Sequence, residues 1–360
     1  MIDKDRLIRT FCELVKIDSP SGEEEEIGKH LTQKFSNLGF NVVKDNYGNL
    51  IASEEGSDPL MLSAHMDTVE PGRNIKPKVL NDRIVSDGST ILGGDCKAGI
   101  AAIIEGVESI LGEGIPRRPA QIVLTREEEI GLVGALNLDY SQITAKEAVV
   151  FDGNGPVNTI TGASPTYIRF DVKVKGIGAH AGVEPEKGLS AIKIATDMIS
   201  DFPQGRLDEE TTFNVGLIEG GTVRNAVPVQ ANFGGEFRSR SSETLDLLQL
   251  QIKNTVQKYQ EKYKKSKIDY ELETMFHMFK LNVNTHVAVS VFNILDDMGL
   301  KPIVKPSGGG TDANIMLFNG IDCIVVGMAT NEMHTVDEYV VTEDLIKTAQ
   351  LCHGLLKKAE

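Results

Sequence analysis

The clearest pattern along the chain is a set of short, almost continuous apolar runs, each bounded by polar residues or glycine. They are PLMLSAH at 59–65, AQIVLT at 120–125, EAVVFDG at 147–153 and IDCIVVGM at 321–328. Strands that are buried on both faces show this pattern, because helices cover both sides of a parallel sheet. We therefore predict a parallel sheet built from these four runs.

Helical patterns separate the runs. Residues 96–114, CKAGIAAIIEGVESILGEG, predict a crossover helix that ends at a glycine. Ile27, Leu31 and Phe35 recur at helical spacing, and Ser19 or Ser21 is a candidate N-cap for that helix. Alternating strands and helices predict a doubly wound α/β fold with a mostly parallel sheet.

The middle of the chain follows a different pattern. From about residue 165 the segment TYIRFDVKVKG alternates with period two, as a half-solvated antiparallel strand does. A helix at about 185–200, a charged helix at about 242–264 and further strands indicate a smaller α+β domain. We predict one catalytic domain, residues 1–164 and 278–360, interrupted by an inserted domain at 165–277.

Composition and charge narrow the class of protein. A formal net charge of −15 and a pI near 5.0 argue against nucleic acid or an anionic membrane as a partner. The sequence contains neither a secretory signal pattern nor an apolar run of about 18 residues. The four cysteines show no paired spacing, so we expect reduced thiols in a cytoplasmic protein.

Acidic and imidazole side chains gather where the predicted strands end. They are His65, Asp67, Asp95, Glu128, Glu129, Asp152 and His334. Ligands of open α/β sheets bind beyond the carboxyl ends of the strands, so we expect these side chains to converge there. Imidazole and carboxylate groups suit two divalent metal ions, zinc above all, with manganese or cobalt as substitutes.

Three consecutive glutamates, 127–129, follow the run at 120–125. Adjacent like charges repel, and two dications would keep such carboxylates ionised. One glutamate is then free to bind a metal while its neighbour acts as a base toward a water that bridges two metals about 3.5–4 Å apart. The base returns the proton to the leaving amine.

Each residue also has a purely structural interpretation. Asp95 is a possible N-cap of the following helix, Asp152 a possible turn residue, and the glutamate run a possible solvated helix start. Motifs of other enzyme classes are absent or incomplete: Ser190 and Lys193 match S-x-x-K without its partner motifs. The loop SGGGTDAN, 307–314, has no lysine for phosphate and is interpreted as a loop whose backbone approaches a substrate.

These residues resemble a known family, the co-catalytic di-zinc metallopeptidases that include peptidase T, carboxypeptidase G, aminoacylase and acetylornithine deacetylase. The resemblance runs along nearly the whole chain through SAHMDTV, LGGDCKAGIAA, LTREEEIG, VFDG, GIGAHAG, GTVRNAVP, SGGGTDAN and MHTVDEYV. HMDTVEPG and REEEIGLVGA are most similar to peptidase T-like members.

The resemblance implies a role for each strand-end residue. His65 and Asp152 would bind one metal and Glu129 and His334 the other, while the carboxylate of Asp95 would bridge both. Asp67 would orient the imidazole of His65, and Glu128 would be the general base. Glu127 and Cys96 receive no role.

In the inserted domain, the resemblance implies substrate contacts. His180 matches a histidine that stabilises the oxyanion, in some relatives from a neighbouring subunit. Asn225 and Arg238 match positions that bind a substrate carboxylate or oxyanion, although a surface ion pair is the alternative for Arg238. Outside that domain, Gly309 in the glycine loop lies near where the family approaches the substrate backbone, and Asn154 departs from the tripeptidase pattern.

We therefore expect a cytoplasmic metal-dependent exopeptidase that acts on short peptides in the manner of a tripeptide aminopeptidase. The alternative is a deacylase of N-acyl amino acids with the same di-metal site. A non-catalytic peptide-binding homologue is disfavoured because the base and every ligand are present. We expect the inserted domain to serve as a lid, and a homodimer paired through this domain is a further hypothesis.

Overall fold

The computed structural model describes residues 1–357, which form two compact units. The first consists of Met1–Ala163, Lys280–Ser307 and the described residues from Thr311 onward. The second consists of Ser164–Phe279 together with Gly308–Gly310. The two units are described separately below.

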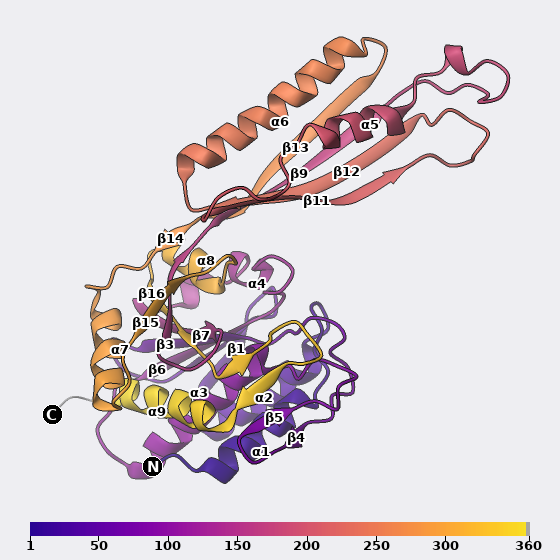
Figure 1. Cartoon of the computed structure of the whole chain (residues 1–360). Helices are drawn as coiled ribbons and strands as arrows, with labels where there is room; N and C mark the ends of the chain where they lie inside the picture. The colour runs from indigo at the N-terminus through magenta and orange to yellow at the C-terminus, as the bar shows by residue number, and fades with distance from the viewer. Residues whose placement is uncertain (358–360) are drawn as a thin grey trace. The chain divides into compact units, whose positions relative to one another are not determined.

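The first unit is built on a nine-stranded sheet (Figure 1). Its central strands, in spatial order, are β6 (Ala120–Thr125), β3 (Leu60–His65), β7 (Glu147–Gly153) and β16 (Asp322–Gly327), which pair in parallel. The outer strands are β1 (Asn41–Lys44), β2 (Leu50–Ser53), β8 (Thr159–Ser164), β14 (Phe279–Lys280) and β15 (Ile303–Pro306). The four central strands are the four apolar runs, so the predicted mostly parallel sheet is confirmed.

The strand register aligns the carboxyl ends of neighbouring strands. His65, the last residue of β3, lies opposite Thr125, the last residue of β6. Val326 near the end of β16 lies opposite Phe151, which precedes Asp152 in β7. Side chains that follow these strands therefore emerge at one edge of the sheet.

Helices pack on this sheet around a single apolar core. The longer ones are α1 (Lys4–Val15), α2 (Glu25–Asn37), α3 (Gly94–Glu113), α7 (His286–Asp297) and α9 (Thr342–Leu356), and the short ones are α4 (Val133–Leu136), α8 (Asp312–Phe318) and the 3-10 turn Tyr140–Gln142. The crossover helix α3 packs closely against β7 at Gly99. A Cβ at this position would be only 2.5 Å from the carbonyl oxygen of Phe151, so only glycine fits there. This close approach places the start of α3 beside the end of β7.

A small four-stranded sheet in the same unit supports a further loop. Its order is β17 (Thr330–Asn331), β18 (Tyr339–Val341), β5 (Arg83–Val85) and β4 (Lys78–Val79). β17 and β18 pair antiparallel, so the loop between them, 332–338, is held at both ends. This loop carries His334.

The second unit is an antiparallel five-stranded sheet with its own apolar core. The strand order is β10 (Gly205–Arg206), β11 (Thr211–Gly220), β12 (Gln230–Ser239), β9 (Thr166–Lys175) and β13 (Lys267–Phe276). Helices α5 (Ala191–Ser200) and α6 (Ser242–Lys262) lie on one face of the sheet (Figure 1). Alternate residues of β9, from Ile168 to Val174, are buried against them, as the period-two pattern predicts.

The starts of two helices differ from the sequence-based expectations. The helix expected at about 185–200 begins at Ala191, where the Ser190 hydroxyl caps it by accepting the Lys193 N–H, so the S-x-x-K match has a structural explanation. Neither Ser19 nor Ser21 caps α2, which begins at Glu25. The four cysteines are free, and no helix among residues 1–357 is both long and apolar enough to cross a membrane.

Candidate metal centre

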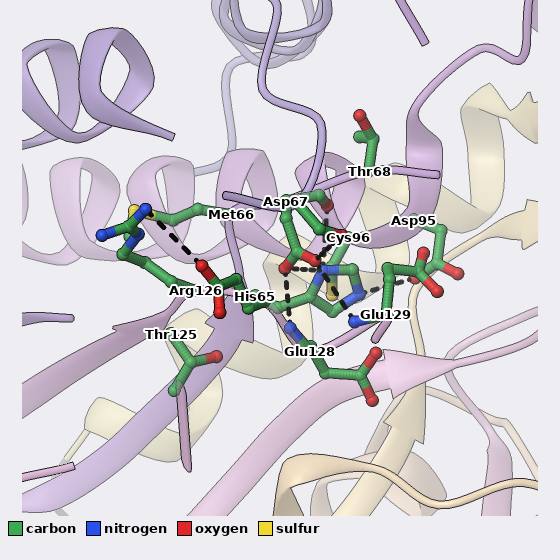
Figure 2. Close-up of polar contacts among 12 residues, drawn as sticks. His65, Met66, Asp67, Thr68, Asp95, Cys96, Thr125, Arg126, Glu128 and Glu129 are labelled. Carbon is green, nitrogen blue, oxygen red and sulfur yellow. Dashed lines mark hydrogen bonds and ion pairs between the residues drawn. The ribbon is translucent and has the colours of Figure 1, made fainter. Parts of the chain in front are cut away.

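The predicted strand-end residues of the first unit lie together at one edge of its sheet (Figure 2). His65 and Asp152 belong to β3 and β7, Glu128 and Glu129 follow β6, and Asp95 lies in the turn that begins α3. His334 reaches the cluster from the loop between β17 and β18. Asp95 and His334, which are 239 residues apart in the sequence, thus meet here.

Asp95 is the centre of the cluster. Its Oδ1 lies 3.0 Å from Nε2 of His65, and its Oδ2 lies 3.2 Å from Nε2 of His334. Asp152 Oδ1 is 3.6 Å from the same nitrogen of His65, and Glu129 Oε2 is 3.0 Å from that of His334. The two oxygens of one carboxylate therefore face two separate sets of ligands.

The potential ligand atoms form two groups that share Asp95. Within each group they all lie within 4.8 Å of one another. The first group is His65, Asp95, Cys96 and Asp152, and the second is Asp95, Glu129 and His334. Imidazole and carboxylate donors at this spacing fit two divalent ions of the zinc, manganese or cobalt type.

Asp67 holds two parts of the cluster together. Its carboxylate is fully buried and lies 3.4 Å from Nδ1 of His65, whose ring nitrogen is also 3.0 Å from the Asp67 carbonyl oxygen. The same carboxylate accepts the backbone N–H groups of Glu128 and Glu129 at 3.0 and 3.2 Å (Figure 2). It also accepts the hydroxyl of Ser21 at 2.7 Å. Beyond orienting an imidazole, Asp67 fixes the backbone of the glutamate run.

Glu127 differs from the other two glutamates of the run in its backbone conformation and its partners. This residue has a left-handed backbone, φ +51°, and its N–H donates to Glu24 Oε1 at 3.1 Å. Its carboxylate accepts the Tyr47 hydroxyl and lies 3.8 Å from the guanidinium of Arg126. Glu127 therefore has its own partners, whereas Glu129 faces His334 in the cluster.

Glu128 is buried, with 9% of its surface exposed. Among the described residues, its carboxylate has no hydrogen-bond or ion-pair partner (Figure 2). Burial and the charge of Asp152 raise the pKa of Glu128 well above its usual value. A carboxylate with these properties is suited to accept and return a proton.

The carboxylates of the cluster lie close together, and this shifts the pKa values of the groups in it. Burial raises the pKa of Asp152 to about 7. Burial and the charge of Asp95 also raise the pKa of Glu129. Hydrogen bonds to Asp95 and Glu129 raise the pKa of His334 to about 10. Dications would offset this crowding of carboxylates, which supports the fit of the donor set to metal ions.

Two further residues beside the cluster were not identified from the sequence. Asp312 at the start of α8 is 2% exposed, and its Oδ2 accepts the hydroxyl of Thr125. Its Oδ1 is buried without a hydrogen-bond partner in the described part of the chain, and burial raises the pKa of Asp312 to about 6. The glycine loop at 307–314 contains Asp312, but its sequence gives no sign that Thr125 is the partner.

The predicted substrate contacts lie in the second unit. The segments of His180 and Asn225 are adjacent, because Ala181 N–H donates to the Asn225 carbonyl at 2.9 Å. The Gly309 carbonyl accepts the Ser164 hydroxyl at 2.9 Å.

Arg238 has partners of its own in the second unit. Its guanidinium lies over the Tyr167 ring, 4.5 Å from the centroid, and pairs with Glu236 at 2.9 Å. Its Nε is buried without a partner among the described residues. Arg238 therefore forms an ion pair, as the structural alternative expects, and also keeps one N–H donor without a partner among the described residues.

Comparisons with known proteins indicate the family of this chain. Residues 163–264 match the peptidase dimerisation domain of the M20 family. The chain is 38% identical to YqjE of Bacillus subtilis (strain 168) over the full length of both. The crystal structure of aminopeptidase PepT from Bacillus cereus ATCC 10987 is 38% identical, with a TM-score of 0.86, over 99% of this chain and 98% of that one.

A second solved structure, a tripeptidase from Staphylococcus aureus subsp. aureus Mu50, is 33% identical with a TM-score of 0.90 over the same shares of both chains. These matches define a metal-dependent peptidase. The chain belongs to the M20 family of metallopeptidases, among its peptidase T-like members. The predicted family and enzyme class are therefore confirmed.

Proposed function

We propose that this enzyme is an exopeptidase that hydrolyses short peptides, in the manner of a tripeptide aminopeptidase, at a centre of two divalent ions. The observation that carries the proposal is the carboxylate of Asp95, whose two oxygens face His65 and His334 separately. Similarity to an aminopeptidase and a tripeptidase over nearly the whole chain supports the substrate class.

The ligands divide between two positions. His65 and Asp152 would hold one ion, Glu129 and His334 the other, and Asp95 both. Ions held there would polarise the scissile carbonyl and lower the pKa of a water molecule. In the tautomer with Nδ1 protonated, His65 donates to the Asp67 carbonyl and keeps the lone pair of Nε2 for the centre.

Glu128 is the group that moves the proton. Its unpaired carboxylate accepts a proton from the attacking water and delivers it to the nitrogen of the leaving amine. Asp67 holds the Glu128 backbone N–H at 3.0 Å and so keeps this carboxylate in place during both transfers.

The inserted domain would supply the substrate contacts. Arg238 has a buried donor without a partner, which suits a substrate carboxylate or oxyanion. His180, Asn225 and Gly309 are the other proposed contacts. A deacylase of N-acyl amino acids remains the second candidate, because the same centre and the same carboxylate contact serve both reactions.

A substrate panel with added zinc, manganese or cobalt separates the two functions. Di- and tripeptides with a free amino terminus are compared with N-acetyl and N-succinyl amino acids, and amine release is followed. We expect cleavage of the peptides. Cleavage of only the acylated compounds would establish the deacylase instead.

Metal binding is expected to strengthen as the pH rises. Hydrogen bonds to Asp95 and Glu129 raise the pKa of His334 to about 10, so at neutral pH the metal-free protein holds a proton on this ring. An ion must displace that proton, and the apparent affinity therefore rises about tenfold per pH unit for each proton displaced. Calorimetric titration in two buffers of different ionisation enthalpy counts the protons; a titration that releases none, with a flat affinity from about pH 6 to 8, would contradict this prediction.

The second unit would pair with a second copy of the chain along β11. Strand β10 covers only Thr212 and Phe213 on the outer side of β11, and Leu217 and Ile218 beyond them are 70% and 55% exposed. The opposite edge, β13, is lined by charged residues, which discourage strand pairing. The match to the dimerisation domain also includes β11 and ends before β13.

Leu217→Lys is expected to convert the dimer into monomers, because a charge would be buried at the paired edge. Molecular mass from light scattering during size-exclusion chromatography measures the change. Tyr270→Lys on β13, where the side chain is 39% exposed, is the matched control and should remain dimeric. Dissociation by the control alone would place the interface on the other edge.

A further inference from the structure

Glu338 is a buried carboxylate beside the metal centre, four residues after His334, and only 1% of its surface is exposed. Its Oε2 accepts the backbone N–H groups of Leu92 and Gly93 at 2.7 and 2.8 Å. Its Oε1 accepts the N–H of Asp95 at 3.1 Å. One side chain thus binds three donors of a segment that is about 240 residues away in the sequence.

The three donors belong to the turn that carries Asp95. Gly93 has a left-handed backbone, φ +72°, and offers no side chain to cap the start of α3. A Cβ at Gly94 would lie 2.8 Å from Thr330 Oγ1 and from Val340 Cγ2, so the turn is packed tightly against β17 and β18. Without Glu338, three backbone donors in this packed turn would lose their acceptor.

The same loop touches Asp95 a second time. The ring of His334 lies 3.2 Å from Asp95 Oδ2, while Glu338 holds the Asp95 backbone. Loop 332–338 therefore carries both a proposed ligand and the group that fastens the turn of the shared carboxylate. The position of Asp95 relative to His334 depends on this double contact.

Both oxygens of Glu338 are used, which argues for a carboxylate at this position. An amide would offer one acceptor oxygen and would direct N–H groups at backbone donors. Burial and the charge of Asp95 raise the pKa of Glu338 to about 7, whereas the three backbone N–H groups that it accepts act in the opposite direction.

We infer that Glu338 is a positioning residue of the metal centre. It holds the turn of Asp95 against the loop of His334, so that the two oxygens of Asp95 face the two histidines. Glu338 acts on the ions only through Asp95. This inference rests on the metal-dependent function proposed above.

The test is the metal affinity of Glu338→Gln, measured by competition with a chelator for Zn²⁺ and by the visible absorption of Co²⁺ bound in the centre. Residues that orient metal ligands typically contribute 10–100-fold to affinity, so we expect about a tenfold or larger loss together with an altered Co²⁺ spectrum. Wild-type protein is titrated in parallel. Failure of the wild type to bind ions would reject the proposed function itself, separately from this inference.

Glu105→Gln is the matched control. Glu105 is also 1% exposed and lies in α3, but it holds the N–H of Asp3 and the guanidinium of Arg6. The control should lower the unfolding midpoint and keep wild-type metal affinity. If Glu338→Gln behaves in the same way, Glu338 only stabilises the fold and the inference is overturned.

A second variant covers a failure of Glu338→Gln to fold. Glu338→Asp keeps the charge but is one methylene shorter, so it reaches fewer of the three donors. We expect a smaller loss of metal affinity, again with a changed Co²⁺ spectrum. Wild-type affinity and spectrum in this variant would also overturn the inference.

Discussion

Glu128→Gln is expected to bind metal as the wild type does and to lose turnover by a factor of about 10²–10⁴. Glutamine has the size of glutamate but accepts no proton at neutral pH. Because Asp67 holds Glu128 through its backbone N–H, the substitution leaves that contact intact. The measurements are kcat with a tripeptide substrate and the metal content of the purified variant.

The neighbouring glutamate provides a matched control. Glu127→Gln changes the adjacent residue by the same single group, and its side chain keeps an oxygen for the Tyr47 hydroxyl. Turnover of this variant should stay within a few-fold of wild type, since the Glu127 carboxylate has Tyr47 and Arg126 as its partners. Retained activity in Glu128→Gln, or an equal loss in both variants, would remove Glu128 from the proposed role.

The sequence predicted the central sheet well because burial on both faces leaves a direct mark on composition. Strands β3, β6, β7 and β16 coincide with the four apolar runs. Parallel strands place their carboxyl ends at one edge, so the convergence of His65 and Asp152, at the ends of β3 and β7, also followed from the sequence.

Hydrogen-bond partners that depend on tertiary packing could not be predicted from the sequence. Ser21 was a candidate helix cap, but α2 begins at Glu25, and the Ser21 hydroxyl donates to Asp67 instead. Glu127 has a left-handed backbone and binds Tyr47, and no local sequence pattern predicts either feature. Glu338 stands in a recognisable motif, yet spacing alone does not reveal that its acceptors are used by the turn of Asp95.

Asp95→Asn is expected to remove both ions, because Asp95 is the residue that the two ligand groups share. The amide keeps one acceptor oxygen and turns an N–H group toward the other histidine, and it carries no negative charge for either dication. The metal content measured by atomic emission should fall from two ions per chain to less than one. The rise in unfolding midpoint on adding Zn²⁺ should disappear as well, since an ion that no longer binds the folded state cannot stabilise it.

Asp152→Asn provides the comparison that makes this prediction specific to a shared carboxylate. Asp152 belongs to only one of the two groups and lies beside His65, with 7% of its side chain exposed. It should therefore lose one ion and keep the one near Glu129 and His334, with part of the thermal stabilisation preserved. Equal metal content in the two variants would mean that the centre does not depend on Asp95 as a bridge, and two ions retained in Asp95→Asn would contradict the arrangement outright.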